Sequence, residues 1–356
     1  SDWSSDVCSS DLKKRLVVAF ESERLTYSDF DVDLYNTGIT QVLSVAAARG
    51  HEIYHFGMDD LYLHEGEAYA RASVLELPEH WAGDPVISHQ FLQKTAERPL
   101  KLDTVDLCFV RGDDIRNYET PNLDLLRTIE EHGVLFETTR ATLATTDKYE
   151  LVCRAPHVPQ PVTCAASSLE EAREALKLLP DEHGWFILKD RYGYGCGEQV
   201  HRIEFADPEL DQILSMYVSL YNHVILQEWC GEVQYGDIVV TFLDGELIAP
   251  MLREPASGEW KTNLSFGAKQ MVHTLTEEQE RIARAAVAVF PEIRYASVDM
   301  LYTGKVMEIN AFPGGKGLYD IYGISVGAII MDKLESEILD LPAPPRDISV
   351  PQVQPS

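Results

Sequence analysis

Residues 297–310 read SVDMLYTGKVMEIN and carry the most informative pattern of the chain. Two short, mostly apolar segments flank a turn at residues 303–304, which predicts a hairpin of two strands. Asp299 on one strand and Glu308 on the next can then face each other, and the period of two places Asn310 on the same face as Glu308. Two carboxylates and an amide oxygen on one surface suit Mg²⁺ (or Mn²⁺) that bridges nucleotide phosphates. The alternative is a surface hairpin with solvated acids.

A second pattern, FILKDRYGYGCG at residues 186–197, combines a lysine at a strand end with closely spaced glycines. Lys189 ends the apolar segment, and such a loop lets backbone N–H groups approach phosphate oxygens. A dinucleotide fingerprint needs a helix after the loop, whereas residues 199–203 read as another strand. A hairpin lid over phosphates is therefore the better interpretation, and a merely mobile turn is the alternative. The loop residues assigned to nucleotide binding are Gly193, Tyr194, Gly195 and Gly197.

Three further candidates lie near expected strand ends or helix starts. Lys148 follows TTD at a helix start and, with Lys189, could supply positive charge. Glu228 ends a strand just before a domain change, where it could meet a ribose or an adenine amine. Arg111 follows the apolar strand DLCFV, at the carboxyl end of an expected parallel strand, where open α/β sheets bind ligands. For each of them an ordinary solvated surface residue is the alternative. The phosphate-loop motif G-x-x-x-x-G-K-[ST] is absent, which counts against a P-loop enzyme.

Composition limits the class of protein. The 356 residues, 45% of them hydrophobic and 25% charged, are typical of a globular protein of two or three domains. The formal charge of -28 would repel nucleic acid and anionic lipid, so neither is expected as a partner. No apolar stretch approaches the ~20 residues needed to cross a bilayer, and no signal peptide is recognisable. Six cysteines without C-x-x-C spacing indicate reduced thiols and, with the preceding points, a cytoplasmic location.

The order of expected elements predicts an α/β unit followed by two further units. In the first, strands alternate with helices that end at Gly50 and Gly133, which indicates a parallel sheet with covered faces. Residues 59–77 read instead as an inserted hairpin around a Gly66-Glu67 turn. The expected elements of the first unit are strands at 15–20, 52–56, 106–110 and 134–137 and helices at 40–49 and 123–132. Those of the later units are helices at 168–179 and 277–290 and strands at 185–189, 199–203, 224–228, 237–243, 246–252, 297–302 and 305–309.

Taken in order, these features resemble the ATP-grasp superfamily, and in particular the bacterial glutathione synthetases, from residue 13 to about residue 339. The segment FGMDDLYLHEGEAYARASVLEL (56–77) looks like the one that ends the second strand in that family. Other segments are similar to its substrate-side R-x-D strand end, its helix-start lysine, its lysine strand, its late arginine, its R-x-N loop and its metal-binding strands. These are, respectively, FVRGDD (109–114), TTDKYE (145–150), FILKD (186–190), LREP (252–255), KTNLSFGA (261–268), and SVDML with MEIN.

The resemblance implies an ATP-grasp fold, α/β and α+β in class, with ATP held between the last two domains. Residues 13–144 would form an N-terminal, substrate-side parallel α/β domain, residues 145–227 a lid domain, and residues 228–340 a C-terminal catalytic domain. Residues 1–12 are expected to be a non-native or disordered tail, and residues 341–356 a second disordered tail. The family also implies a homo-oligomer.

The resemblance further implies a reaction. A substrate carboxylate would attack the γ-phosphate of ATP to give an acyl phosphate, and an amine would then displace phosphate. For a glutathione synthetase these substrates are γ-glutamylcysteine and glycine. A related amino-acid or short-peptide ligase, or a non-catalytic nucleotide-binding protein, is the alternative. The implied roles are metal binding by Asp299, Glu308 and Asn310, α- and β-phosphate binding by Lys148 and Lys189, phosphoryl and carbonyl stabilisation by Arg253, Asn263 and Lys261, and acceptor binding by Arg111.

The sequence departs from the family pattern in three places. After Asp237 the family usually has a basic residue, but residues 238–240 are Ile-Val-Val, so either a phosphate contact is missing or Lys261 or Arg191 supplies it. Lys261 itself stands where the family has the arginine of R-x-N, a point charge in place of a fork. The loop after Asn310 is AFPGGKG, whose Gly314 and Gly315 are expected near the acceptor, which makes glycine the least secure substrate.

Overall fold

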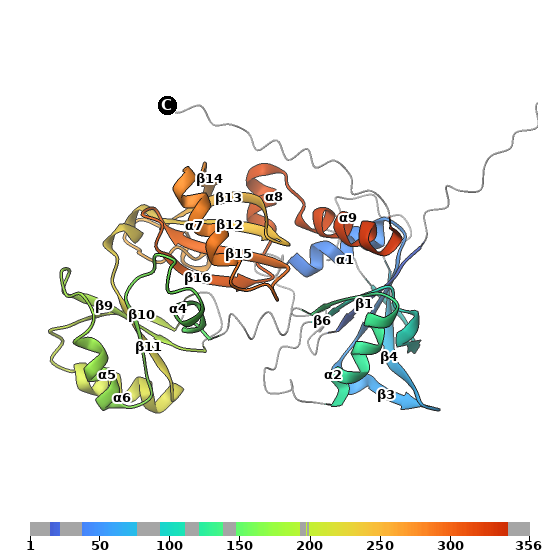
Figure 1. The fold of residues 1–356 in the computed structure, drawn as a ribbon, viewed down its shortest axis with the longest axis horizontal. Helices are drawn as coiled ribbons and strands as arrows, with labels where there is room; N and C mark the ends of the chain where they lie inside the picture. Colours follow the sequence, from blue (N-terminus) through green and yellow to red (C-terminus); the bar gives the residue numbers. More distant parts are fainter. Residues whose placement is uncertain are drawn as a thin grey trace, which may run out of the picture. The chain divides into compact units, whose positions relative to one another are not determined.

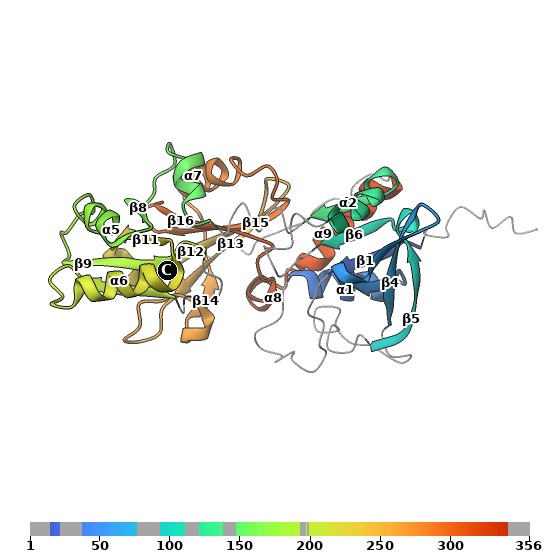
Figure 2. The same ribbon diagram turned by 90° about the horizontal axis from the view of Figure 1, so that it is seen from below.

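The computed structural model describes residues 15–21, 38–76, 93–110, 121–137, 147–192, 197 and 199–340. They fall into two compact units, Ser1–Glu137 with Gly327–Pro345, and Thr138–Val326 with the C-terminal residues (Figures 1 and 2). Of the features predicted from the sequence, both tails and four site residues lie outside the described residues. The four are Arg111, Gly193, Tyr194 and Gly195.

A mixed sheet forms the centre of the first unit. Its order is β3-β4-β2-β1-β6-β7, with β5 beside β4. The four strands β2, β1, β6 and β7 are parallel, as the alternation predicts. The hairpin β3–β4 and the unpredicted β5 add antiparallel strands, so the sheet is mixed as a whole. The bounds are β1 Val17–Glu21, β2 Glu52–Phe56, β3 Leu61–His64, β4 Glu67–Glu76, β5 Gln93–Lys101, β6 Leu107–Val110 and β7 Val134–Glu137.

Two glycine predictions have different outcomes. Helix α1 (Gly38–Ala48) ends before Gly50, whose φ of 84° is the left-handed cap that was predicted. Helix α2 (Pro121–Leu126) instead tightens into a 3₁₀ segment, Arg127–Glu131. Gly133 is needed there because a Cβ would lie 2.4 Å from the carbonyl oxygen of Asp106, so close approach and not a helix cap requires it. The β3–β4 turn is at residues 65–66, one position earlier than predicted.

A half-buried polar cluster fastens helix α9 (Val326–Leu339) to the residues that follow α1, and the two helices lie side by side in Figures 1 and 2. Arg49 pairs with Glu335 at 2.9 Å and with Asp332 at 2.7 Å. His51 accepts the N–H of Leu16 at Nδ1 (3.2 Å), so its Nε2 carries the proton and donates to Glu335 at 2.9 Å. Glu335 therefore satisfies two donors at once.

Replacing Glu335 with alanine is expected to lower the free energy of unfolding by about 1–3 kcal/mol, because the buried His51 N–H loses its acceptor and the Arg49 guanidinium loses one of its two. Urea unfolding followed by circular dichroism measures this. Glu97→Ala is the control, because Glu97 is 71% exposed and pairs only with Lys94 among the described residues; it should change stability by less than about 0.5 kcal/mol. Equal effects in the two variants would contradict a role for the cluster.

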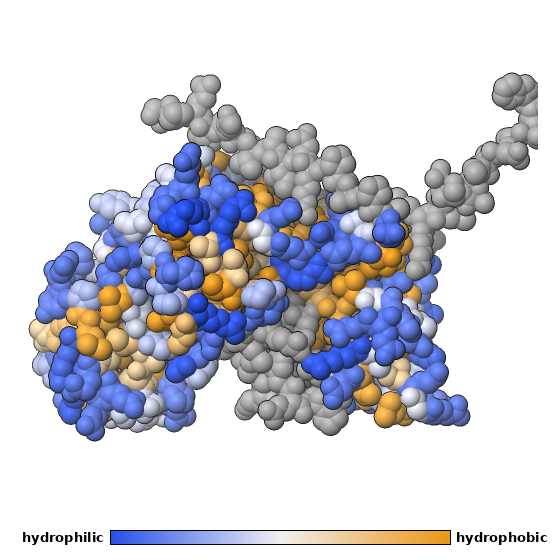
Figure 3. Space-filling view, in the orientation of Figure 1, coloured by the Kyte–Doolittle hydropathy of each residue, from blue (hydrophilic) through white to orange (hydrophobic). Residues whose placement is uncertain are grey.

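The second unit contains a four-stranded antiparallel sheet of order β10-β9-β11-β8. Helices α5 and α6 pack on one face of it through an apolar cluster that includes Phe186, Leu188 and Leu214. Helix α6 was not predicted from the sequence. Apolar side chains also gather on the outer surface over α5 and α6 (Figure 3), where Leu178, Met216 and Leu220 are exposed. The bounds are β8 Thr163–Ala166, α5 Leu169–Leu176, β9 Trp185–Asp190, β10 Val200–Glu204, α6 Leu210–Tyr221 and β11 Val224–Glu228.

A five-stranded antiparallel sheet of order β14-β13-β12-β15-β16 completes the second unit. Ile238, Val240 and Phe242 of β12 pack with α7 in one core. Because side chains alternate along a strand, Asp237 and Val239 face the opposite side. The bounds are α4 Glu150–Arg154, β12 Asp237–Leu243, β13 Glu246–Glu254, β14 Lys269–Val272, α7 Glu277–Val287, β15 Tyr295–Leu301, β16 Val306–Ala311 and α8 Lys316–Tyr322. Among the described helices, none has the length and apolar character that a membrane span requires.

Candidate active site

A cleft lies between the four-stranded and the five-stranded sheets of the second unit. It contains about 780 Å³ of space not filled by protein atoms, including solvent at its open side. The structure brings most of the described candidates together here, although they come from distant parts of the sequence. The candidates that line the cleft are Lys189, Gly197, Glu228, Arg253, Lys261, Asn263, Asp299 and Glu308.

The predicted pairing of the two acidic strands is confirmed. Asp299 on β15 lies opposite Glu308 on β16, and Ser297 lies opposite Asn310. The register shifts by one residue just after Asp299, which leaves Met307 as the extra residue of a β-bulge. Met307 and Glu308 consequently both line the cleft, although strict alternation would send them to opposite faces.

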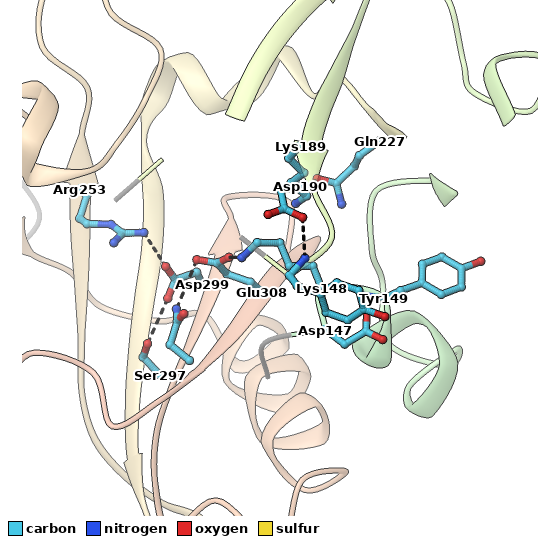
Figure 4. A network of polar contacts seen from close by, with 12 residues as sticks. Asp147, Lys148, Tyr149, Lys189, Asp190, Gln227, Arg253, Ser297, Asp299 and Glu308 are labelled. Atoms are coloured by element: carbon cyan, nitrogen blue, oxygen red, sulfur yellow. Dashed lines mark hydrogen bonds and ion pairs between the residues drawn. The ribbon is translucent and has the colours of Figure 1, made fainter. Parts of the chain in front are cut away.

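Arg253 joins two buried carboxylates on the floor of the cleft, and Figure 4 shows its contact with one of them, Asp299. Its Nε and Nη2 donate to the two oxygens of Asp237, the first at 2.9 Å, and Nη2 also donates to Asp299 at 2.6 Å. Burial opposes the charge on Arg253, but Asp299 and Asp237 outweigh it and raise the pKa of the guanidinium above its usual range. Burial raises the pKa of Asp299 to about 6 although Arg253 faces it.

Two lysines approach Glu308 from the other side of the cleft (Figure 4). Lys148 Nζ lies 3.4 Å from Glu308 Oε2, and the buried Lys189 donates to Gln227 at 3.1 Å. Burial, with a smaller contribution from the charge of Lys148, lowers the pKa of Lys189 to about 8. Burial would raise the pKa of Glu308, but Lys148, Lys189 and Arg253 outweigh it and lower the pKa to about 2. Two positively charged lysines thus surround the negatively charged carboxylate of Glu308.

The position of Lys148 is set by the end of β9. Arg191 forms a two-point ion pair with Asp147, at 2.7 and 2.6 Å, and its carbonyl accepts the N–H of Lys148 at 3.1 Å. Since Arg191 is engaged with Asp147 and does not line the cleft, it is poorly placed to replace the basic residue expected after Asp237. Of the two proposed substitutes, Lys261 is the one that lines the cleft.

Lys261 and Asn263 both lie against Gly197, the last glycine of the glycine loop. Lys261 Nζ donates to the Gly197 carbonyl at 2.7 Å and lies 4.4 Å from the ring centre of Phe266. Gly197 has a φ of 78°, and a Cβ there would lie 2.6 Å from Asn263 Oδ1. Glycine is therefore required at this position by both conformation and close approach.

Four residues predicted to bind ATP, metal or substrate either have their polar atoms bonded to other protein groups or do not line the cleft. Glu228 lines the cleft, but its carboxylate accepts from Lys305 at 2.6 Å and from the Val162 amide at 2.9 Å. Asn310 donates to Glu308 at 3.4 Å. The pair Gly314 and Gly315 precedes α8, with Gly315 at its N-cap, and neither is among the described residues that line the cleft.

Sequence reasoning missed several residues of the cleft. The search for a basic residue covered the three positions after Asp237 but gave Asp237 itself no role. This aspartate is 1% exposed and accepts hydrogen bonds from Arg253. A lone acid that opens the otherwise apolar run DIVVTFL was a usable signal. No comparable sequence signal marks three other residues of the cleft. They are Gln227, which is hydrogen-bonded to Lys189 and Thr163, and the cleft-lining Trp229 and Trp260.

Two short stretches match enzyme motifs by spacing alone. HEIYH at 51–55 has the spacing of a zinc-binding H-E-x-x-H, and GISVG at 323–327 that of a nucleophile elbow. The first motif needs a helix, but this segment forms β2, and both ring nitrogens of His51 are hydrogen-bonded. The second needs a strand, a turn and a helix, whereas Ser325 lies between α8 and α9. The structure supports neither chemistry.

The acidic residues suit Mg²⁺ better than a metal held by protein alone. In the described part of the chain no group of three or more His, Cys, Asp or Glu side chains could hold a metal ion. Mg²⁺ is commonly bound by one or two carboxylates together with substrate phosphates and water. Asp299 and Glu308, opposite each other with Asn310 beside Glu308, fit that pattern.

Comparisons with known proteins agree with this geometry. The family model described as "Prokaryotic glutathione synthetase, ATP-grasp domain" matches residues 157–317, and the one for the N-terminal domain of the same family matches residues 33–140. The glutathione synthetase of Vibrio cholerae is 28% identical over 82% of this chain and 90% of its own. That of Photorhabdus laumondii is 29% identical over 76% and 82%.

Solved structures match the fold across nearly the whole chain. The ATP-grasp ligase PsnB, complexed with its minimal precursor, has a TM-score of 0.57 at 16% identity and covers 91% of this chain and 99% of its own. Two adjacent family models and relatives aligned along most of their length point to one conclusion. The chain belongs to the prokaryotic glutathione synthetase family and is an ATP-grasp ligase.

Proposed function

We propose that this ligase joins γ-glutamylcysteine and glycine to form glutathione, with conversion of ATP to ADP and phosphate. The observation that supports the proposal most is the convergence of three cations on the two facing carboxylates: Lys189 and Arg253 line the cleft with them, and Lys148 reaches Glu308 from beside it. This arrangement is suited to bind and polarise phosphates, and the one cysteine among the described cleft-lining residues, Cys230, is not an activated nucleophile because burial raises its pKa to about 12. The arrangement therefore suits a reaction in which the substrate carboxylate is itself the nucleophile.

The cleft has an apolar end and a charged end. Ile187, Val200, Leu301 and Met307 supply apolar surface that suits the nucleobase. The charged end would receive the phosphates, with Lys148 and Lys189 at the α- and β-phosphates. Glycine-loop amides, including that of Gly197, would cover the remaining oxygens. Exclusion of water from the cleft matters because an acyl phosphate hydrolyses readily.

Asp299, Glu308 and Asn310 would hold Mg²⁺, which when bound supplies charge neutralisation between the β- and γ-phosphates. The solved PsnB complex with Mg and ADP is one related structure that contains both. In this chain, the facing lysines keep Glu308 ionised, since they lower its pKa to about 2.

Arg253 would stabilise the phosphoryl group as it moves to the carboxylate. Its Nε and Nη2 are used by Asp237 and Asp299, whereas no hydrogen bond of Nη1 occurs within the described residues. The two carboxylates thus fix the guanidinium plane and leave one amino group for the substrate. Asn263 and Lys261 would donate to the carbonyl oxygen as it becomes tetrahedral, and Arg111 would bind a carboxylate of the acceptor peptide.

A related ligase with another acceptor or amine is the second candidate, and one observation favours it. Val239 lies on the cleft side of β12, opposite Asp299 in register, within the segment where the family has a basic residue. The reacting end therefore has less positive charge than the family pattern implies. We further propose a cytoplasmic homo-oligomer, and a domain division at residues 13–144, 145–227 and 228–340.

Product identification tests the proposed reaction. Protein, Mg-ATP, γ-glutamylcysteine and glycine are mixed, ADP release is followed, and the product mass is measured. ADP formation with a mass equal to glutathione supports the proposal. ADP that forms only with another amine or acceptor supports the second candidate. Nucleotide binding without turnover for any tested pair would leave a non-catalytic nucleotide-binding role.

Nucleotide affinity is expected to fall as the pH rises through about 8, because Lys189 loses its proton there and a neutral amine no longer attracts phosphate. Below that pH the lysine is charged and the affinity should be constant. Titration calorimetry with Mg-ADP between about pH 7 and pH 9.5 should show up to roughly tenfold weaker binding per pH unit at the alkaline end. Lys189→Arg stays charged and should flatten the profile. A flat profile in the unmodified protein would contradict the assignment.

A further inference from the structure

Three aromatic rings and one guanidinium form a continuous row beside the cleft. The guanidinium carbon of Arg202, on β10, lies 4.5 Å from the ring centre of Trp185 and 4.6 Å from that of Trp229. Trp229 meets Trp260 edge to face, with ring centres 5.3 Å apart and an interplanar angle of 82°. These four residues are called the Arg202 row below. A guanidinium between two indole faces is a rigid, favourable arrangement.

The row connects the two sheets of the second unit. Trp185 and Arg202 belong to the neighbouring strands β9 and β10, whereas Trp260 lies in the connection between β13 and β14, residues 255–268. Trp229 and Trp260 line the cleft, but Arg202 and Trp185 are not among the described residues that do. Arg202 therefore stands behind the cleft wall, in contact with the cleft-lining Trp229 and close enough for its charge to act on Glu259.

The 255–268 connection runs from Trp260 directly into residues of the phosphate end. Glu259 accepts the amides of Trp260 at 2.7 Å and Lys261 at 3.1 Å, which holds the segment in a tight turn. Lys261 then bonds the Gly197 carbonyl, and Asn263 lies against the same glycine. The segment that ends the aromatic row thus carries two groups assigned to the reacting phosphate and carbonyl.

We propose that Arg202 is a positioning residue for nucleotide binding: it holds Trp229 and, through it, Trp260, so that Lys261 and Asn263 are fixed at the phosphate end. The inference rests on the proposed use of the cleft as the nucleotide site. Arg202, which lies outside the cleft, would thus couple the aromatic wall formed by Trp229 and Trp260 to the phosphate-end groups of Lys261 and Asn263.

The dissociation constant of a non-hydrolysable Mg-ATP analogue, which carries the γ-phosphate, tests this role without requiring turnover. Arg202→Ala is expected to weaken binding roughly tenfold, because two cation–aromatic contacts are lost, and Arg202→Lys should lie between the two. Arg173→Ala is the matched control: Arg173 is a 52% exposed arginine of α5 paired with Asp211, and its loss should leave the constant unchanged. Binding by Arg202→Ala within twofold of the unmodified protein would overturn the proposal.

A double-mutant cycle separates positioning from a general structural effect. In a Lys261→Ala background, Arg202→Ala should weaken binding of the same Mg-ATP analogue by no more than about two- to threefold, because the group it positions is already gone. A full tenfold further loss would mean independent effects and would refute positioning. Should Arg202→Ala fail to fold, Trp260→Leu replaces it in the same cycle with the same expectations. Normal binding of this analogue without glutathione formation would refute the proposed reaction alone, whereas an unaffected Arg202→Ala would refute only this inference.

Discussion

Glu308→Gln should reduce turnover with Mg-ATP by about a thousandfold while leaving the protein folded, because a charge is lost from the proposed metal site. Glu308 lies opposite Asp299, and removal of its charge also leaves Lys148 and Lys189 without the carboxylate between them. Asp299→Asn should have a comparable effect on turnover. Initial rates of ADP release at saturating Mg²⁺, with circular dichroism to check folding, measure both variants.

The matched control is Glu278→Gln, on the outer side of the same unit. Glu278 is 64% exposed and pairs with Arg281 on its own helix, so turnover should not change. Near-normal rates in both Glu308→Gln and Asp299→Asn would show that these carboxylates do not seat the metal.

Arg253→Ala should reduce turnover by a similar factor and, unlike Glu308→Gln, should also destabilise the fold by about 3–5 kcal/mol. The reason is that Asp237 and Asp299, 1% and 3% exposed, would be left as buried carboxylates without their common cation. Urea unfolding and ADP release measure the two effects separately. Arg281→Ala, an exposed arginine of α7, is the control and should change neither.

The destabilisation in Arg253→Ala should depend on pH in a defined direction. Burial already raises the pKa of Asp299, and without the guanidinium the main opposing effect is lost, so Asp299 then favours the folded state only when protonated. The loss of stability should therefore be small near pH 4 and grow as the pH rises toward 8. A loss that is the same at all pH values would contradict the burial of unpaired carboxylates.

The facing of Asp299 and Glu308 could be predicted from the sequence, because two short strands joined by a turn bring their side chains into register. The detail that makes the pairing work could not. Met300 lies opposite Val306, and if this register continued, Asp299 would lie opposite Met307. The β-bulge shifts the partner of Asp299 by one residue, to Glu308. A bulge depends on local twist and packing, which a pattern of alternation does not record.

The pairing of Asp237 with Arg253 also depends on a one-residue register shift. An Asp-Gly turn at residues 244–245 predicts the β12–β13 hairpin. Its register near the turn, with Leu243 opposite Glu246, would place Asp237 opposite Leu252. A shift between Thr241 and Phe242 moves the partner to Arg253. Both polar pairs on the cleft floor thus depend on one extra residue in a strand, and neither extra residue is visible in the sequence.

Long-range contacts of single side chains were also beyond sequence reasoning. Arg191 was considered as a substitute cation, but its ion pair with Asp147, 44 positions away, arises only from the folded positions of β9 and α4. Strand β5 escaped prediction because QKTAERPLK is mostly polar and exposed, as an edge strand can be. By contrast, the buried strands β1 and β6 are continuous apolar runs and were predicted.

A crystal structure with Mg²⁺ and a non-hydrolysable ATP analogue tests the central claim most directly. The triphosphate is expected between Lys148, Lys189 and Arg253, with the metal in contact with Asp299, Glu308 and Asn310. A triphosphate bound away from those three metal-site residues would contradict the proposed chemistry.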